Sequence, residues 1–159
     1  MADSVRVEGL DEVLAMFNNA PQAVDRIGKK WLRDWSLYGI REVQRFTLNA
    51  GAADTNELIQ GMQYHIESTA TGLESTIKPS DKADKYAIYV EEGTEPHMPP
   101  ISALQGWADR HGIPVWAVAL KIAREGTEPR HMFRDAFETL DSRVDSELDD
   151  FLDDLLRNL

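Results

Sequence analysis

Histidines and carboxylates are the residues of this chain best suited to metal or acid–base chemistry. The histidines are His65, His97, His111 and His131, and no two of them stand four residues apart, the spacing that presents two imidazoles to zinc from one helix. His97 and His131 follow two similar turns, so a metal site that includes Glu92 is geometrically conceivable. Exposed turns commonly carry polar residues that bind nothing, and we therefore predict no metal ligands.

The motifs that build catalytic and cofactor sites are missing from the sequence. There is no glycine-rich phosphate loop, no Gly-x-Ser-x-Gly elbow and no cysteine to act as a nucleophile, a metal ligand or a disulfide partner. The 28 acidic residues fall mostly on faces that solvent would cover, and none forms a pair in an apolar setting that would raise one pKa. The sequence therefore predicts a protein that is not an enzyme, with no catalytic residues and no cofactor.

The composition is that of an acidic protein with enough apolar residues for one folded domain. Of 159 residues, 42% are hydrophobic, and the formal net charge is -11 at pH 7. Binding to phosphates needs clustered positive charge, so this balance argues against specific or non-specific nucleic-acid binding. The chain shows neither a signal-peptide pattern nor a long apolar run. We expect a single domain without a membrane segment, made in a cytoplasm.

A predicted strand at Tyr86–Glu91 is the element around which the others are expected to be arranged. Its apolar residues recur at every second position, and its aromatic and β-branched content suits a strand. Residues 62–67 and 73–78 predict two further strands, so the three would form an antiparallel meander. The connection over residues 78–85 is charged and is expected to be exposed.

A proline-rich arm is predicted after Gly93. Pro96, Pro99 and Pro100 fix the backbone and remove hydrogen-bond donors, so the chain should run extended there. The tetrapeptide Gly-Thr-Glu-Pro at residues 93–96 recurs at residues 126–129, and we interpret the two copies as similar turns. Two copies do not make a repeat protein.

Helices are predicted on both sides of these strands. A short strand over residues 5–8 and a helix capped by Asp11 precede a long amphipathic helix that begins near Pro21. Asp54 or Thr55 should cap a further short turn. The long helix carries a basic face, which is either a solvated helix surface or a docking surface; its residues are Arg26, Lys29, Lys30, Arg33, Arg41 and Arg45.

Two short helices follow the arm. Ser102 and Gln105 stand in the relation of a capping box for the first helix, which should end at Gly112. Pro114 should open the second, whose apolar residues nearly surround it over residues 115–122. This second helix should be largely buried or covered by a neighbouring subunit.

The last predicted element is a long C-terminal helix with an apolar seam and dense acid on its other faces. The seam consists of Phe133, Phe137, Leu140, Val144, Leu148, Phe151 and Leu155. It either packs back on the domain or is shared between subunits. The predicted fold is therefore α+β: an antiparallel β-sheet meander packed by long helices. Its three parts are an N-terminal strand and helices over residues 1–53, the meander and arm over 54–100, and a helical part over 101–159.

Taken together, residues 54–140 resemble the neck and tail-component family of tailed bacteriophages, which includes head–tail connector and tail-completion proteins. That family carries a Tyr-Ala-x-Tyr-Val-Glu-x-Gly-Thr segment, present here at residues 86–94, and then a proline-rich arm. A closing segment with Gly-Thr-x-Pro, Phe and Ala stands here at residues 126–136, ahead of the C-terminal helix. The family's Thr-Gly-x-Leu turn corresponds to residues 55–58, where Asn56 replaces the usual glycine and also tolerates a left-handed backbone.

The resemblance implies a structural virion protein that forms a homo-oligomeric ring between the capsid and the tail. Its partners would be other copies of itself, connector proteins on the portal side, and a tail-tube or tail-terminator protein. DNA would only pass through the channel. The residues we expect to contact subunits or partners are Glu92, Gly93, Thr94, Pro96, Pro99, Pro100, Trp116, Thr127, Pro129, Phe133, Phe137, Leu148 and Phe151.

Three other functions remain open at the level of sequence. A tail terminator that caps the tail tube belongs to the same structural class. A small metal-dependent hydrolase would need bound metal that is lost on His97→Ala. A host-directed binding module would capture one cellular protein as a monomer or dimer.

Overall fold

The computed structural model describes residues 21–52, 54, 56–69 and 72–158 of the chain, and it confirms the α+β class. The strand predicted at residues 5–8 and the helix capped by Asp11 lie outside the described residues. The elements, in chain order, are α2 (Pro21–Asn49), α3 (Glu57–Gln60), β1 (Gln63–Thr69), β2 (Gly72–Lys78), α4 (Asp81–Glu92), α5 (Ile101–His111), α6 (Val115–Glu125) and α7 (Met132–Asn158).

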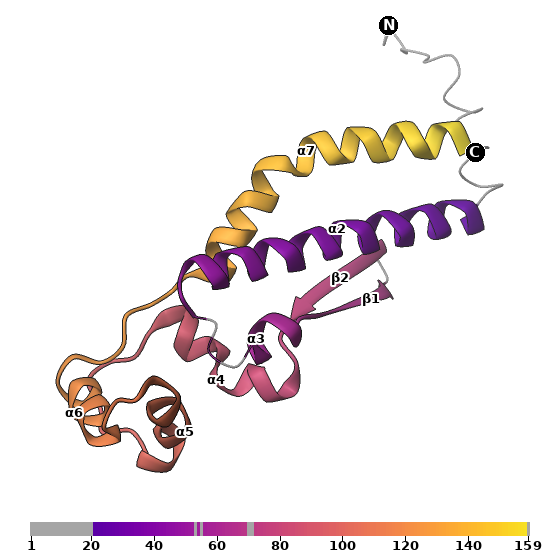
Figure 1. The fold of residues 1–159 in the computed structure, drawn as a ribbon. Coiled ribbons are helices and arrows are strands. Elements are labelled where there is room, and N and C mark those ends of the chain that lie inside the picture. The colour runs from indigo at the N-terminus through magenta and orange to yellow at the C-terminus, as the bar shows by residue number, and fades with distance from the viewer. Residues whose placement is uncertain (1–20, 53, 55, 70–71, 159) are drawn as a thin grey trace, which may run out of the picture.

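The two long helices α2 and α7 lie side by side and run in opposite directions (Figure 1). The indole Nε1–H of Trp31 donates to the backbone oxygen of Glu147 at 3.1 Å, and the Trp31 ring contacts Phe151 with centroids 5.3 Å apart. Arg143 on α7 donates to the hydroxyl oxygen of Tyr38 on α2 at 2.9 Å. Five of the seven seam residues are buried or half-buried, so most of the seam packs back on the domain, which was the first of its two predicted arrangements, while Phe137 and Leu148 are exposed.

Strands β1 and β2 form an antiparallel hairpin with Gln63 opposite Lys78. One face of the hairpin is half-buried against α2, where two glycines leave room for it: a Cβ at Gly28 would lie 2.8 Å from Leu73, and one at Gly39 would lie 2.7 Å from Ile77. The predicted pair of strands is therefore confirmed, with ends that differ by one or two residues.

The third predicted strand is wrong, because Tyr86–Glu91 belongs to helix α4. Ala83, Ala87 and Glu91 follow one another at intervals of four residues, and all three are buried. The alternation of larger apolar residues that suggested a strand was misleading, since small Ala87 occupies the buried face. The same helix begins at Asp81, inside the connection that was predicted to be an exposed charged segment.

The core forms where α4 and the start of α7 meet α2 and the hairpin. One cluster combines Leu58, Ala83, Ala87 and Met132. A second cluster combines Ile40, Val43, Met62 and Ala136. Phe46 and Phe133 pack against both, so the two clusters are continuous.

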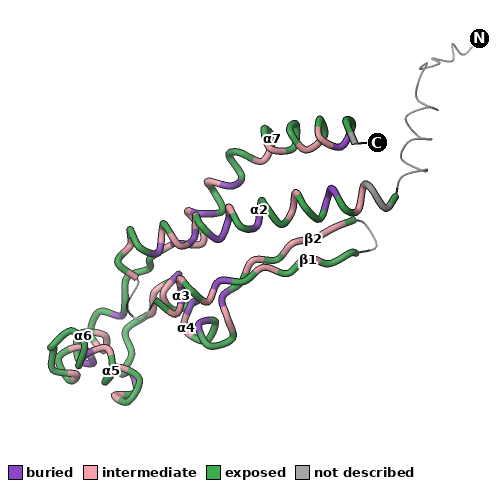
Figure 2. Tube along the Cα trace, turned by 45° about the vertical axis from the view of Figure 1, so that its right-hand side comes forward, coloured by how far each residue is buried: buried purple, intermediate pink, exposed green. Residues whose placement is uncertain are grey.

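Helices α5 and α6 form a hairpin of their own at the end of the molecule opposite the C-terminus (Figures 1 and 2). Gly112 ends α5, as predicted, and it adopts the left-handed conformation. The predicted capping box is wrong, because Pro100 is the N-cap and Ser102 already lies inside the helix. Ala108 and Ala119 are fully buried, and these small residues suit close contact between the two helices.

Helix α6 is not buried within the chain. Trp116 is 58% exposed and Leu120 53%, so the expectation that the chain itself would largely bury this helix is wrong. Coverage by a neighbouring subunit stays a prediction.

Candidate functional site

The two Gly-Thr-Glu-Pro segments pair with each other at the base of the α5–α6 hairpin. Thr94 and Thr127 form an antiparallel bridge in which each backbone N–H donates to the other residue's carbonyl oxygen, at 3.1 and 3.0 Å. Their hydroxyl oxygens are 3.0 Å apart. The chain enters the hairpin through the first segment and leaves it through the second, so this crossing, residues 93–96 and 126–129, joins the hairpin to the rest of the molecule.

The glycines of the crossing are required by both conformation and space. Gly93 has φ 70° and Gly126 has φ 72°, a region that residues with a side chain rarely adopt. A Cβ at Gly93 would lie 2.3 Å from the Thr127 oxygen, and one at Gly126 would lie 1.9 Å from the Thr94 oxygen. Only glycine allows the two segments to approach this closely.

Glu91 anchors the start of α7 beside the crossing. The residue is 7% exposed, and its two carboxylate oxygens accept the backbone N–H groups of Phe133 and Arg134, each at 2.9 Å. The Glu91 carbonyl oxygen also accepts the N–H of His131 at 3.1 Å. A buried carboxylate at a helix N-terminus satisfies donors that have no partner within the helix and complements the helix dipole. The end of α4 and the start of α7 are thereby held together.

Sequence reasoning missed this role of Glu91. We placed it on a strand and selected its exposed neighbour Glu92 as a contact residue. The spacing of the residues could have revealed it. Glu91 stands four residues after Ala87 and eight after Ala83, so in a helix it shares their buried face.

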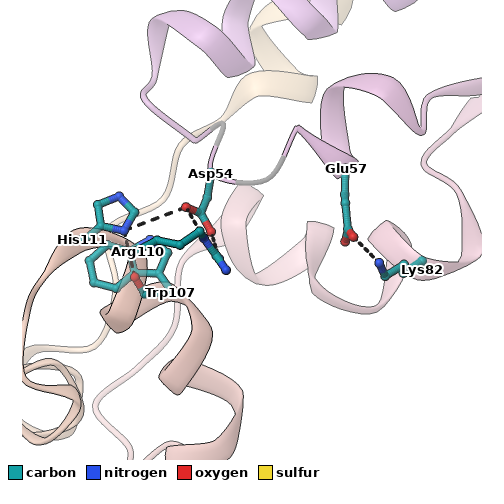
Figure 3. Close-up of polar contacts among 6 residues, drawn as sticks. All are labelled: Asp54, Glu57, Lys82, Trp107, Arg110 and His111. Atoms are coloured by element: carbon teal, nitrogen blue, oxygen red, sulfur yellow. Dashed lines mark hydrogen bonds and ion pairs between the residues drawn. The ribbon is translucent and has the colours of Figure 1, made fainter.

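A second contact fastens the hairpin to the body of the molecule. Figure 3 shows Asp54, in the loop between α2 and α3, facing Arg110 and His111 at the end of α5. The Arg110 Nε–H donates to Asp54 at 3.2 Å, and a second guanidinium nitrogen also pairs with this carboxylate. His111 stacks on Trp107 with centroids 4.2 Å apart. The prediction that Asp54 or Thr55 would cap the next turn is therefore wrong, because the N-cap of α3 is Asn56 in the left-handed conformation, with φ 59°.

The hydrogen bond from Arg110 lowers the pKa of Asp54 below its ordinary value, since it favours the charged carboxylate. On the neighbouring surface, Lys82 pairs with Glu57, and that hydrogen bond raises the pKa of Lys82 (Figure 3). All four groups are at the surface. The Arg110–Asp54 pair joins α5 to the loop between α2 and α3, and the Lys82–Glu57 pair joins α4 to α3.

The proline arm packs on its own chain. The backbone N–H of His97 donates to the Ile122 oxygen of α6 at 3.4 Å, and the His97 ring bonds the Glu95 oxygen at 2.9 Å. Pro99 is buried and Pro100 caps α5. The arm was predicted to run extended and outside any ladder after Gly93; it forms one β-bridge, at Thr94, and neither helix nor strand from there to Pro100. The arm positions α5 within the same chain.

The other predicted contact residues divide between covered and exposed positions. Phe133 and Phe151 are half-buried inside the chain, Phe151 against Trp31. Phe137 and Leu148 are exposed on α7. The predicted set is thus a mixture of residues at the crossing, residues inside the fold and residues on two open helix surfaces.

The basic face of α2 forms ion pairs with acidic residues of the same helix. Lys29 pairs with Asp25 at 2.9 Å and Arg33 with Asp34 at 3.2 Å. These contacts suit the interpretation of a solvated helix surface.

In the described part of the chain, no group of three His, Asp or Glu side chains is arranged to hold a metal ion. None of the helices described there is long and apolar enough to cross a membrane. Comparison with protein-family models, with curated proteins and with solved structures found no match to this chain.

Proposed function

We propose that this chain is a structural component of the neck of a tailed virus, a head–tail connector or tail-completion protein that assembles as a ring. The main support for the proposal is that the two motifs of the sequence resemblance contact each other in the structure. Thr94 pairs with Thr127, and Glu91 of the first motif holds the N–H of Phe133 in the second, although more than 30 residues separate each pair. The two motifs are thus two halves of one junction, which accounts for their occurrence together.

Exposed apolar surface supports a role in assembly. Large apolar side chains are exposed on α6 at one end of the molecule and on α7 toward the other. Monomeric proteins rarely leave such groups contiguous, because their burial is favourable. Rings are built from head-to-tail contacts between unlike surfaces, and an elongated subunit with two different open ends suits that geometry.

The acidic charge of the chain suits a channel through which DNA passes without binding. The net charge is -11, and acid is concentrated on α7. A channel lined with carboxylates repels phosphates, so a DNA end could pass through it without adhering.

Binding to purified connector and tail-tube proteins of one tailed virus tests this proposal. We expect the chain to bind at least one of them, and an unrelated protein of similar negative charge serves as the control. Failure to bind either partner, from solutions in which the chain itself is folded, would refute the proposal.

A further inference from the structure

We propose that copies of this chain join head to tail, with the exposed face of α6 in one copy seated on the exposed stripe of α7 in the next. The inference deepens the proposed function and rests on it for the expectation of a closed ring. The contact itself joins two different surfaces, one on α6 and one on α7.

The first surface is the outer face of α6. Trp116, Leu120 and Arg124 stand at intervals of four residues, so they form one row along the helix, with Lys121 beside it. All four are exposed. The opposite side of the helix is occupied within the chain, where Ala119 is fully buried. We call these four residues the α6 face: two large apolar side chains beside two cations, of which Arg124 also lies 3.9 Å from the carboxylate of its neighbour Glu125.

The second surface is a stripe on α7. Leu148, Leu152 and Leu156 also stand at intervals of four residues, and they are between 39% and 61% exposed. Asp145 and Asp149 are exposed on the flank of this row. We call these five residues the α7 stripe. It is the apolar and acidic counterpart of the apolar and basic α6 face.

The charge around the stripe is not neutralised by the residues that the structure describes. From residue 141 to the end of α7 there are seven carboxylates and two arginines. Arg143 pairs with Glu147 and Arg157 with Asp153, so these two cations are already engaged with other acids. Within the described residues, Asp145 and Asp149 form no ion pair, and a cationic surface on another molecule would offset their mutual repulsion.

The α6 face and the α7 stripe can meet only between two different copies of the chain. The α5–α6 hairpin and the C-terminal half of α7 lie at opposite ends of the molecule in both views (Figures 1 and 2). One chain therefore cannot bring its own α6 face onto its own α7 stripe. A contact between unlike surfaces at opposite ends repeats from copy to copy and closes into a ring when the rotation per copy allows it.

Two single-cysteine variants test the contact directly, since the natural chain has no cysteine. Leu120→Cys places a thiol on the α6 face and Leu152→Cys places one on the α7 stripe. The two variants, distinguished by a tag, are mixed and treated with a short bis-maleimide linker. We expect a cross-linked pair that contains one copy of each variant, while either variant alone gives little product. Leu48→Cys is the matched control, because Leu48 is similarly exposed but lies at the end of α2, outside both surfaces.

Charge reversal provides a second test that does not depend on linker geometry. Lys121→Glu with Arg124→Glu, or Asp145→Lys with Asp149→Lys, should each weaken self-association roughly tenfold. A mixture of the two double variants should recover at least part of that loss. Because all four residues are exposed, the variants should fold normally.

The contact is overturned if Leu120→Cys links mainly to itself, if the mixture gives no more product than the Leu48→Cys control, or if no charge rescue occurs. These results would leave the proposed function standing whenever the chain still binds connector or tail-tube proteins. Conversely, specific cross-linking without any such binding would support the contact and refute the proposed function.

Discussion

Replacing Glu91 by alanine should destabilise the protein more than any neighbouring surface substitution. The change removes a buried carboxylate that accepts two backbone N–H groups at 2.9 Å, from Phe133 and Arg134. Hydrogen bonds to a charged group contribute about 1.5–3 kcal/mol each, and loss of a helix cap costs about 0.5–2 kcal/mol. The two bonds form one cap and are not additive, so we expect a loss of about 2–4 kcal/mol in the free energy of unfolding.

Urea and thermal unfolding followed by circular dichroism measure this loss. For a chain of this size, about 2–4 °C of Tm corresponds to each kcal/mol, so Tm should fall by about 5–15 °C. Glu91→Gln keeps one acceptor oxygen and should lie between the wild type and Glu91→Ala. Glu92→Ala is the matched control, because Glu92 is adjacent but exposed, and it should change stability by less than about 0.5 kcal/mol.

Amide exchange at Phe133 and Arg134 gives a local check. Both N–H groups should exchange faster in Glu91→Ala than in Glu92→Ala. Equal stability of Glu91→Ala and Glu92→Ala would refute the view that this carboxylate holds α7 to α4.

Other substitutions test the crossing and the contact between the loop and α5. Gly126→Ala adds a Cβ 1.9 Å from a backbone oxygen at positive φ, and we expect a loss of about 3 kcal/mol or more, measured by urea unfolding. Gly112→Ala, also at positive φ but with nothing within 4 Å, should cost only about 1 kcal/mol; equal losses would contradict the close approach at the crossing. The carboxyl carbon of Asp54 should titrate by NMR below the ordinary value of 3.8, and Arg110→Gln should return it toward that value. Because the pKa of Asp54 is lowered in the folded state, this pair stabilises the fold fully above pH 3.8, and the stabilisation is lost as the pH falls through the lowered pKa. An unchanged titration of Asp54 in Arg110→Gln would show that Arg110 does not cause the shift.

Much of the fold could be predicted because its signals are local. The helical spacing from Pro21 and in the C-terminal seam gave the two long helices, and Gly112 and Gly126 marked the ends of the two short ones. Asn56 was expected to tolerate a left-handed backbone, and it adopts one. Each of these features depends on residues within a few positions of one another.

The errors arose where distant parts of the chain decide the outcome. The segment Tyr86–Glu91 is apolar enough for a strand or a helix, and the choice depends on Ala83 and Ala87 packing against Leu58 and Met132. The identical Gly-Thr-Glu-Pro copies were visible in the sequence, but nothing local shows that they pair with each other. The cap formed by Glu91 joins residues 42 and 43 positions apart, which lies beyond any local pattern.

Light scattering at low and high salt gives the mass of the purified protein in solution and shows whether copies of the chain assemble. We expect a species at a multiple of 18.0 kDa that appears in negative-stain images as a ring with a central hole. High salt should weaken it, because the facing surfaces carry opposite charge. A single species of 18.0 kDa at every salt and protein concentration, with no binding to connector or tail-tube proteins, would show that the chain does not assemble in this way.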